Sequence, residues 1–426
     1  MTFDFNLSEK VFPGGLKLVL LPRPEALSIT VLAMVAAGSK YELKKENGLS
    51  HFLEHMCFKG TKNRPNARAI SSELDSLGAK SNAFTSFEYT GYYVTTKTDH
   101  LAQAIEIVAD IYLNSIYSES EIEKEKGVII EEIKMYRDMP NRHIFDLLNQ
   151  TVYGNQPAGW NVAGEEKTVR RFTRQDFLSY HKRHYVAEAT TVVIAGNFDP
   201  QMAEKLVGGF FADIKKTKPV DKMPVKDNQR QKRIVSQWKK TDQTHLGIGF
   251  RGFDIFDRRA YSALVLSGIL GEGMSSRLFL KIRDELGAAY YVFSDHESLT
   301  DHGLFSIFAG VDTSRASFVM SAILAECRRL KEEMVTKAEL TKAKEYIIGN
   351  LYLGLETSSR QALFVGLQKT LKGKISNLKE QTKKIEQVTA TDIKKVAQEI
   401  FQEKNLNLAL IGPQRSLKAF AQELTV

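Results

Sequence analysis

The chain has 426 residues, of which 43% are hydrophobic and 26% charged, as is usual for a soluble globular protein with two or more cores, and this excludes a disordered or fibrous protein. No run of about 18 apolar residues occurs, and the first residues lack a basic segment followed by an apolar one, so we expect neither a membrane span nor a secretory leader. The net charge of +8 is mostly local to residues 215–233, so we expect no nucleic-acid partner.

Residues 14–35 cluster apolar side chains around Pro22 and Pro24, which predicts two strands joined by a turn. Residues 48–56, Gly-Leu-Ser-His-Phe-Leu-Glu-His-Met, follow as a short predicted helix. Its apolar side chains recur at helical spacing and predict a face turned toward a core, formed by Leu49, Phe52, Leu53 and Met56.

The same helix carries a candidate metal site on another face. His51 and His55 lie one turn apart, so both imidazoles can bind one ion, and we predict one zinc ion per chain. Glu54 lies between them in helical angle, where it can act as the general base toward a metal-bound water. The alternative is an ordinary buried helix whose histidines are hydrogen-bonded.

The rest of the first half alternates helices and strands. We predict helices over residues 67–77, 100–113 and 119–136, paired strands over 81–96, and a buried strand over 191–196. A catalytic zinc usually has three protein ligands, and helix 119–136 offers several carboxylates as the third. Its periodicity does not select among them, although two share a face; the candidates are Glu121, Glu123, Glu125, Glu131 and Glu132.

The second half repeats this order of elements. Residues 286–288 match 77–79, residues 339–348 match 121–130, and residues 408–413 match the strand near 192–196. We therefore predict an α+β fold of two homologous domains, each an antiparallel-rich sheet packed with helices: residues 1–214 with the metal site, a basic linker over 215–233, and residues 234–426.

The repeat is not symmetric in its chemistry. The second half lacks His-x-x-Glu-His, and Ala343 and Asn350 stand where the first half has Glu125 and Glu132. Only the first half is expected to hold the metal. The two cysteines are far apart in sequence, which argues against a disulfide framework and favours a reducing, cytoplasmic location.

The motif around His51 and the spacing to Glu132 resemble the pitrilysin-type (inverted-zincin, M16) metallopeptidases, in particular short-chain members related to the mitochondrial processing peptidase beta subunit. The resemblance implies a LuxS/metallopeptidase-like fold forming half of a clamshell, and zinc-dependent hydrolysis of peptides or unfolded polypeptides inside a closed chamber. It assigns His51, His55 and Glu132 as zinc ligands, Glu54 as the base, and Glu125 as a carboxylate behind the ligands.

The resemblance also implies substrate-binding residues. Asn82, Ala83, Phe84 and Thr85 match the family's edge strand, to which a peptide adds through main-chain hydrogen bonds. Arg283 and Tyr290 match an Arg/Tyr pair that holds the substrate and stabilises the oxyanion. The alternative for this pair is a structural Arg bound to Glu285 and a core Tyr.

Because one chain carries both the metal motif and the Arg/Tyr pair, we expect a homodimer. The Arg/Tyr pair and the missing transit peptide favour a bacterial protein, and we expect peptide substrates and no membrane partner. Two alternatives stay open: a non-catalytic core subunit of the same fold, or a presequence-processing subunit. Among the other histidines, His181 and His184 flank Lys182 and Arg183, which predicts an exposed helix face.

Overall fold

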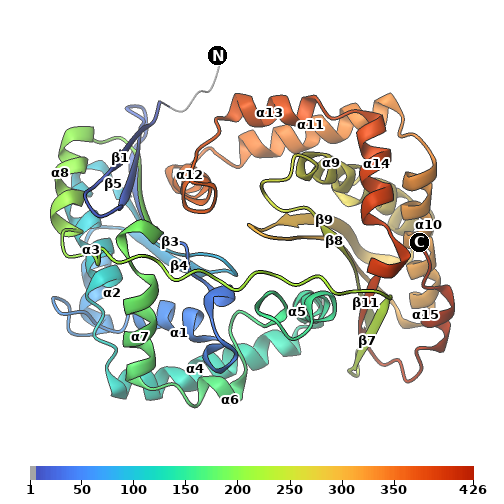
Figure 1. Cartoon of the computed structure of the whole chain (residues 1–426), viewed down its shortest axis with the longest axis horizontal. Helices are drawn as coiled ribbons and strands as arrows, with labels where there is room; N and C mark the ends of the chain where they lie inside the picture. Colours follow the sequence, from blue (N-terminus) through green and yellow to red (C-terminus); the bar gives the residue numbers. More distant parts are fainter. Residues whose placement is uncertain (1–5) are drawn as a thin grey trace. The chain divides into compact units, whose positions relative to one another are not determined.

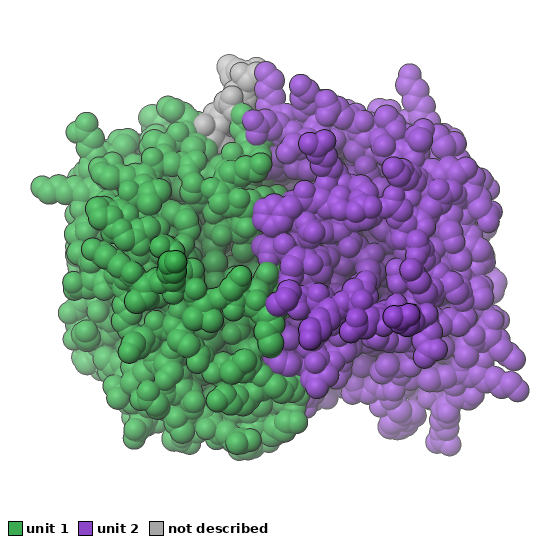
Figure 2. Space-filling view, in the orientation of Figure 1, with its two compact units in different colours: residues 1–134, 161–223, 352–378 green, residues 135–160, 224–351, 379–426 purple. Residues whose placement is uncertain are grey.

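The computed structural model describes residues 6–426, which divide into two compact units, each built around one β-sheet (Figure 1). Within the described residues, unit 1 comprises residues 6–134, 161–223 and 352–378; unit 2 comprises residues 135–160, 224–351 and 379–426 (Figure 2). Both units combine a mostly antiparallel sheet with helices, which confirms the predicted α+β class of two similar domains.

The sheet of unit 1 has six strands in the order β1-β2-β6-β3-β5-β4. β2 and β6 pair in parallel and the other neighbours are antiparallel. The two strands predicted within residues 14–35 are present but are not paired with each other, because β6 lies between them. The strands are β1 (Ser8–Val11), β2 (Lys17–Pro22), β3 (Ser28–Val35), β4 (Lys80–Thr85), β5 (Thr90–Lys97) and β6 (Thr190–Gly196).

A large apolar core lies between one face of this sheet and the helices of the first half. Leu18, Ile29 and Val31 contribute to it from the sheet, and Phe52 and Phe177 contribute from helices. These elements are α1 (Leu49–Met56), α2 (Ala67–Ser76), α3 (Leu101–Leu113), α4 (Glu119–Asp138), α6 (Glu166–Val169), α7 (Arg174–His184) and α8 (Pro200–Phe210).

The sheet of unit 2 has five strands in the order β7-β11-β8-β10-β9. Its parallel and antiparallel pairings repeat those of β2-β6-β3-β5-β4 strand for strand, so the internal repeat read from the sequence is also a repeat of topology. The strands are β7 (Arg233–Trp238), β8 (Gln243–Gly252), β9 (Ala289–Ser298), β10 (Gly303–Asp312) and β11 (Asn407–Gly412).

One face of this second sheet packs on α9, α10 and α14 around a core that includes Leu246, Ile323 and Val396. The helices of the second half are α9 (Ala260–Gly271), α10 (Ala316–Glu332), α11 (Lys337–Leu353), α12 (Ser358–Lys372), α13 (Leu378–Glu386), α14 (Ala390–Ile400) and α15 (Lys418–Glu423). No helix among residues 6–426 is long and apolar enough to cross a membrane.

Each sheet has its second face covered by a helix from the other half of the sequence. α12 packs on β3 and β6 of unit 1, where Val365 joins a core with Leu32 and Val193. α5 (Pro140–Tyr153) packs on β8 and β11 of unit 2. Because α5 follows α4 as α12 follows α11, the two helices occupy the same place in the repeat and are exchanged.

The predicted domain boundaries describe the sequence repeat, whereas the compact units are discontinuous because of this exchange. Residues 216–231 contain neither helix nor strand, and β7 begins at Arg233. The predicted basic linker therefore corresponds to an extended connection that passes from unit 1 to unit 2 after Met223.

Candidate metal centre

The helix that carries the two candidate imidazoles is held firmly in unit 1. Leu49, Phe52, Leu53 and Met56 are all buried, as their spacing predicts. Gly48 precedes the helix with φ 98°, a left-handed conformation that favours glycine, and an added Cβ would lie 2.7 Å from the Ala163 carbonyl oxygen. The apolar stripe fixes which face of α1 turns away from the core, and His51 and His55 lie on that face.

The buried carboxylate of Glu42 completes the start of α1. It accepts hydrogen bonds from the backbone N–H of Gly48 at 2.9 Å and of Ser50 at 2.7 Å, which are amides that a helix leaves without intrahelical partners. The Ser50 hydroxyl and the Asn47 side-chain amide also donate to it. Burial raises the pKa of Glu42 to about 7, although these hydrogen bonds act in the opposite direction.

His51, His55 and Glu132 come together as the family resemblance implies. Nε2 of His51 lies 3.8 Å from Oε2 of Glu132, and Nε2 of His55 lies 3.6 Å from the same oxygen. A tetrahedral zinc ion with bonds of about 2.1 Å places its ligand atoms about 3.4 Å apart. The donor set and its spacing therefore fit zinc, with a fourth position left for a water molecule or substrate.

Glu125 lies behind this set, two turns before Glu132 on the same face of α4. Its Oε1 is 2.9 Å from Nδ1 of His55, and its Oε2 is 2.6 Å from Nζ of Lys59. A carboxylate on Nδ1 holds the proton there and leaves Nε2 of His55 free to bind a metal. Nδ1 of His51 is buried without a hydrogen-bond partner among the described residues, so packing alone orients that ring.

The two histidines titrate differently because their surroundings differ. Burial, helped by the nearby His55, lowers the pKa of His51 to about 3, so this imidazole is neutral at pH 7. Burial also lowers the pKa of His55, but the hydrogen bond to Glu125 and the charges of Glu54 and Glu132 outweigh it and raise the pKa overall. A metal ion can bind Nε2 of His55 only when this nitrogen carries no proton, so metal binding would compete with protonation of His55.

Glu54 sits beside the histidines and is held by a residue of the edge strand. The Thr85 hydroxyl donates a hydrogen bond of 2.5 Å to Oε2 of Glu54. Burial raises the pKa of Glu54, while the Thr85 hydrogen bond and His55 partly offset this and Glu132 adds to it. A carboxylate with a raised pKa accepts a proton more readily near neutral pH, as a general base must.

A cavity of about 300 Å³ opens between this helix and β4. Glu54, His55 and Glu125 line one side, and Asn82 and Ala83 of the predicted edge strand line the other. β4 ends the sheet, so one side of its backbone has no neighbouring strand among residues 6–426. The Ala83 N–H on this strand is bonded instead to the Asn82 side chain at 2.9 Å, a contact that an added peptide strand can replace.

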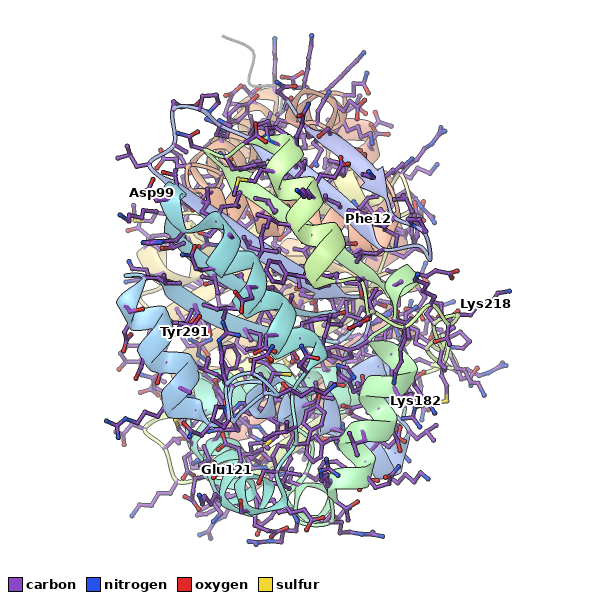
Figure 3. The ribbon with its side chains drawn as sticks, turned by 90° about the vertical axis from the view of Figure 1, so that its left-hand side faces the viewer. Phe12, Asp99, Glu121, Lys182, Lys218 and Tyr291 are labelled. Carbon is purple, nitrogen blue, oxygen red and sulfur yellow. The ribbon has the colours of Figure 1, made fainter. Side chains whose placement is uncertain are left out.

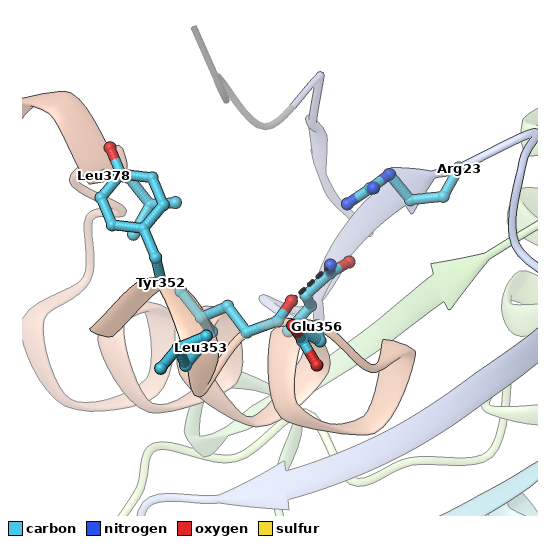
Figure 4. Close-up of a pocket in the computed structure, with 7 residues that line it drawn as sticks. Arg23, Tyr352, Leu353, Glu356 and Leu378 are labelled. Carbon is cyan, nitrogen blue, oxygen red and sulfur yellow. Dashed lines mark hydrogen bonds between the residues drawn. The ribbon is translucent and has the colours of Figure 1, made fainter. Parts of the chain in front are cut away.

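A second cavity of about 350 Å³ in unit 1 lies between the β2–β3 turn and the segment that joins α11 to α12 (Figure 4). Leu353 and Leu378 give it apolar walls, and Arg23 and Glu356 are its only charged lining residues. It offers no imidazole or thiol to a metal and holds none of the predicted site residues.

Arg283 and Tyr290, the predicted substrate-binding pair, lie in unit 2. Arg283 is exposed on a π-helical segment over residues 279–285 and stacks on the Phe279 ring at 5.1 Å. Tyr290 is exposed on the edge strand β9. Glu285 pairs with Lys281 rather than with Arg283, so the alternative of a structural Arg–Glu pair is wrong; the role of the pair toward substrate stays a prediction.

Three features were missed or predicted wrongly from the sequence. Lys59 is a partner of Glu125 that the motif does not indicate, although it lies four residues after His55. The capping role of Glu42 was also missed. The predicted exposure is wrong for His184, which is buried against the rings of Tyr41 and Tyr180. His181 is half-buried, and its Nε2 lies 2.8 Å from the Tyr112 carbonyl oxygen.

The chain matches two adjacent family profiles. The profile described as Insulinase (Peptidase family M16) matches residues 18–166, which include the metal centre. The profile described as Peptidase M16 inactive domain matches residues 171–347, in agreement with the missing metal motif of the second half.

Curated proteins and solved structures resemble nearly the whole chain. The protein named "Uncharacterized zinc protease YmxG" of Bacillus subtilis is 34% identical over 95% of this chain and 98% of its own. A protease from Helicobacter pylori has the same fold, with a TM-score of 0.89, 24% identity, and coverage of 96% of this chain and 100% of the other. A chain of complex III2 from Candida albicans also shares the fold, with a TM-score of 0.85, 18% identity, and coverage of 98% and 100%.

Proposed function

Because the chain belongs to the M16 (insulinase) family of peptidases, we propose that it is a zinc-dependent endopeptidase that cleaves peptides or unfolded polypeptides. The observation that carries the proposal is the spacing of three donor atoms, on His51, His55 and Glu132, at distances suited to one tetrahedral ion. Glu54 beside them supplies the group that such a hydrolase needs to move a proton.

A zinc ion bound there would supply Lewis-acid activation of water and of the scissile carbonyl. His51, His55 and Glu132 would hold the ion, and Glu125 would keep His55 in the tautomer that exposes Nε2. Glu54 would take a proton from the attacking water and pass it to the leaving amine, with Thr85 holding its carboxylate in place.

We further propose that the substrate lies along β4 as an added strand. Asn82 and Ala83 face the cavity that Glu54 and His55 also line, so a peptide on this edge passes the metal centre. An extended backbone is a condition for such pairing, which favours short or unfolded chains over folded proteins. Incubation with casein peptides and with a folded control protein tests this preference.

The quaternary structure and the location of the protein belong to the proposal as well. We propose a homodimer in the cytoplasm, with Arg283 and Tyr290 holding the substrate backbone and the oxyanion. Both residues are exposed on unit 2, and both cysteines are free and buried. Light scattering of the purified chain tests the dimer, and the activity of this chain alone separates the proposal from a subunit that works only with a different partner chain.

The decisive experiment measures zinc and peptidase activity together. Glu54→Gln is expected to keep one zinc per chain and to lose about 10²–10⁴-fold in kcat, because only the base is removed. Glu132→Gln is expected to lose zinc and activity together. Glu131→Gln is the matched control, since Glu131 is exposed on the same helix and pairs with Lys134 rather than with a residue of the site.

If Glu54→Gln cleaved a quenched fluorescent peptide at the wild-type rate, the proposed mechanism would be wrong. If the wild-type chain bound no zinc and cleaved nothing, the alternative of a non-catalytic subunit of the same fold would take its place.

A further inference from the structure

A groove of about 560 Å³ runs along the outer face of α7 in unit 1. One wall is formed by side chains on one face of α7, and the other wall is formed by the segment that follows α8. The lining residues are Gln175, Leu178, Ser179, Lys182 and Arg183 of α7, and Lys215, Thr217, Lys218 and Val220 of the segment. Lys182 and Lys218, from opposite walls, lie at the same edge of unit 1 (Figure 3).

Every charged side chain in this lining is positive. Arg183 is paired with Glu46 at 2.9 Å, but no carboxylate of the described residues lies within salt-bridge distance of Lys182, Lys215 or Lys218. Burial and the charge of Lys182 lower the pKa of Lys215, as expected where two ammonium groups lie close together. The groove therefore carries uncompensated positive charge, which attracts an anionic partner.

The walls of the groove are anchored to the rest of unit 1. Lys215 forms a parallel bridge with Val186, and its carbonyl accepts a hydrogen bond of 2.8 Å from the Ala187 N–H. Farther along the segment, Nζ of Lys222 lies 3.6 Å from the buried carboxylate of Glu88. The segment is thus held at Lys215 and again at Lys222, before and after the lining residues Thr217, Lys218 and Val220, so a ligand would meet a surface that already exists.

The lining fits an acidic polypeptide better than other anions. Phosphate groups favour helix N-termini, whereas Lys182 and Arg183 occupy the last turn of α7. The lining contains no aromatic ring on which a nucleic-acid base could stack or which could enter a membrane interface. Leu178 and Val220 provide apolar contacts between the cationic side chains, and Gln175, Ser179 and Thr217 provide hydrogen-bonding groups.

We propose that this cationic groove binds acidic segments of polypeptides in which carboxylates alternate with apolar side chains. The opposite face of α7 packs on the metal-binding helix, where the Phe52 and Phe177 ring centroids are 4.9 Å apart and the Tyr180 and Ser50 hydroxyls are 2.8 Å apart. If the proposed peptidase function holds, the groove is a docking site for substrates with an acidic stretch, one helix behind the metal centre.

Binding is measured on the full-length Glu54→Gln chain, so that the result does not depend on turnover. The probe is a fluorescein-labelled peptide of alternating glutamate and leucine, and its glutamine counterpart is the control peptide. The triple variant Lys182→Glu, Lys215→Glu, Lys218→Glu is compared with Lys379→Glu, Lys383→Glu, Lys395→Glu, which makes the same charge change at exposed lysines of unit 2.

We expect fluorescence anisotropy to show binding of the acidic peptide that weakens with salt and falls at least about tenfold in the groove variant, but not in the control variant. In the active enzyme, the groove variant should raise KM for an acid-tailed substrate without changing kcat. Equal losses in both triple variants, no binding of the probe to the parent chain, or tighter groove-dependent binding of RNA, inorganic phosphate or anionic vesicles would overturn the proposal.

Discussion

At the scale of single residues, the contact between Thr85 and Glu54 connects two parts of the candidate site. Thr85 belongs to the strand proposed to bind the peptide, and Glu54 belongs to the helix proposed to bind the metal. The hydrogen bond of 2.5 Å fixes one carboxylate oxygen and leaves the other available for a proton. Thr85 therefore positions the base from the same strand that positions the substrate.

Replacing Thr85 by Val should lower kcat about tenfold while KM and zinc content stay unchanged, because about 1.4 kcal/mol of hydrogen bonding to the base is lost. Thr85→Ser keeps the hydroxyl and should restore most of the rate. Steady-state kinetics with metal analysis measures both. Thr90→Val is the control, since Thr90 lies in the same β4–β5 hairpin as Thr85 but its hydroxyl donates to the Ala37 carbonyl and not to Glu54. Equal losses of kcat in the two valine variants would refute a positioning role.

At this scale the sequence predicted side chains whose chemistry depends on local spacing. His51, Glu54 and His55 lie within one helix, so helical geometry alone places them together. The choice of Glu132 over the other carboxylates of α4 came from the family resemblance, because periodicity does not reveal which carboxylate faces another helix. The hydrogen bond from Thr85 to Glu54 joins residues that are far apart in the chain, so no local sequence pattern predicts it.

At the scale of elements, the position of α1 depends on Glu42 as well as on its apolar stripe. Each of its two carboxylate oxygens accepts two hydrogen bonds from groups at the start of the helix. Such a cap is hard to predict, because Glu42 is separated from the helix by a 3₁₀ turn, η2 (Lys44–Glu46). The burial of His184 is equally hard to predict, since its neighbours Lys182 and Arg183 line the outer groove while its own side chain turns into the unit.

Glu42→Gln should destabilise the protein by about 1–3 kcal/mol, because an amide nitrogen would face groups that already donate hydrogen bonds. Urea denaturation at pH 8 measures the loss. Glu123→Gln, which removes an exposed carboxylate paired with Lys126, should change stability by less than about 0.5 kcal/mol. A Glu42 variant as stable as this control would show that the buried cap contributes little.

At the scale of the whole molecule, the repeat of elements was readable from the sequence, and with it the two-sheet architecture. The exchange of α5 and α12 could not be predicted, because the pattern of an amphipathic helix shows that it has an apolar face but not which sheet covers that face.

The stability of the whole molecule also depends on buried histidines. Burial, with smaller effects from neighbouring groups, lowers the pKa of His181 and of His184 to about 4 from 6.5.

A histidine whose pKa is lowered on folding contributes stability that is full above pH 6.5 and is lost as the pH falls toward 4. For His184 this loss is about 2 kcal/mol by pH 5. Burial raises the pKa of Glu42 and Glu272 to about 7, and such carboxyl groups stabilise the folded state as the pH falls. The pH dependence of the free energy of unfolding of the wild type therefore combines both effects.

The comparison with His184→Gln isolates the histidine. The free energy of unfolding of this variant, relative to wild type, should rise by about 2 kcal/mol between pH 7 and pH 5. Urea denaturation of both proteins at the two pH values measures it. A difference that is the same at pH 7 and pH 5 would mean that His184 is not held neutral by its surroundings.

The reciprocal placement of α5 and α12 limits how this polypeptide can be divided. A fragment ending in residues 215–233 would retain α5 but lack α12, leaving Leu32 and Val193 of its sheet open to water. The complementary fragment would retain α12 but lack α5, which would leave Ala409 and Ile411 of its own sheet uncovered. Neither gene half is thus an independent folding module, and soluble material should form only when the two pieces are co-expressed and reassociate.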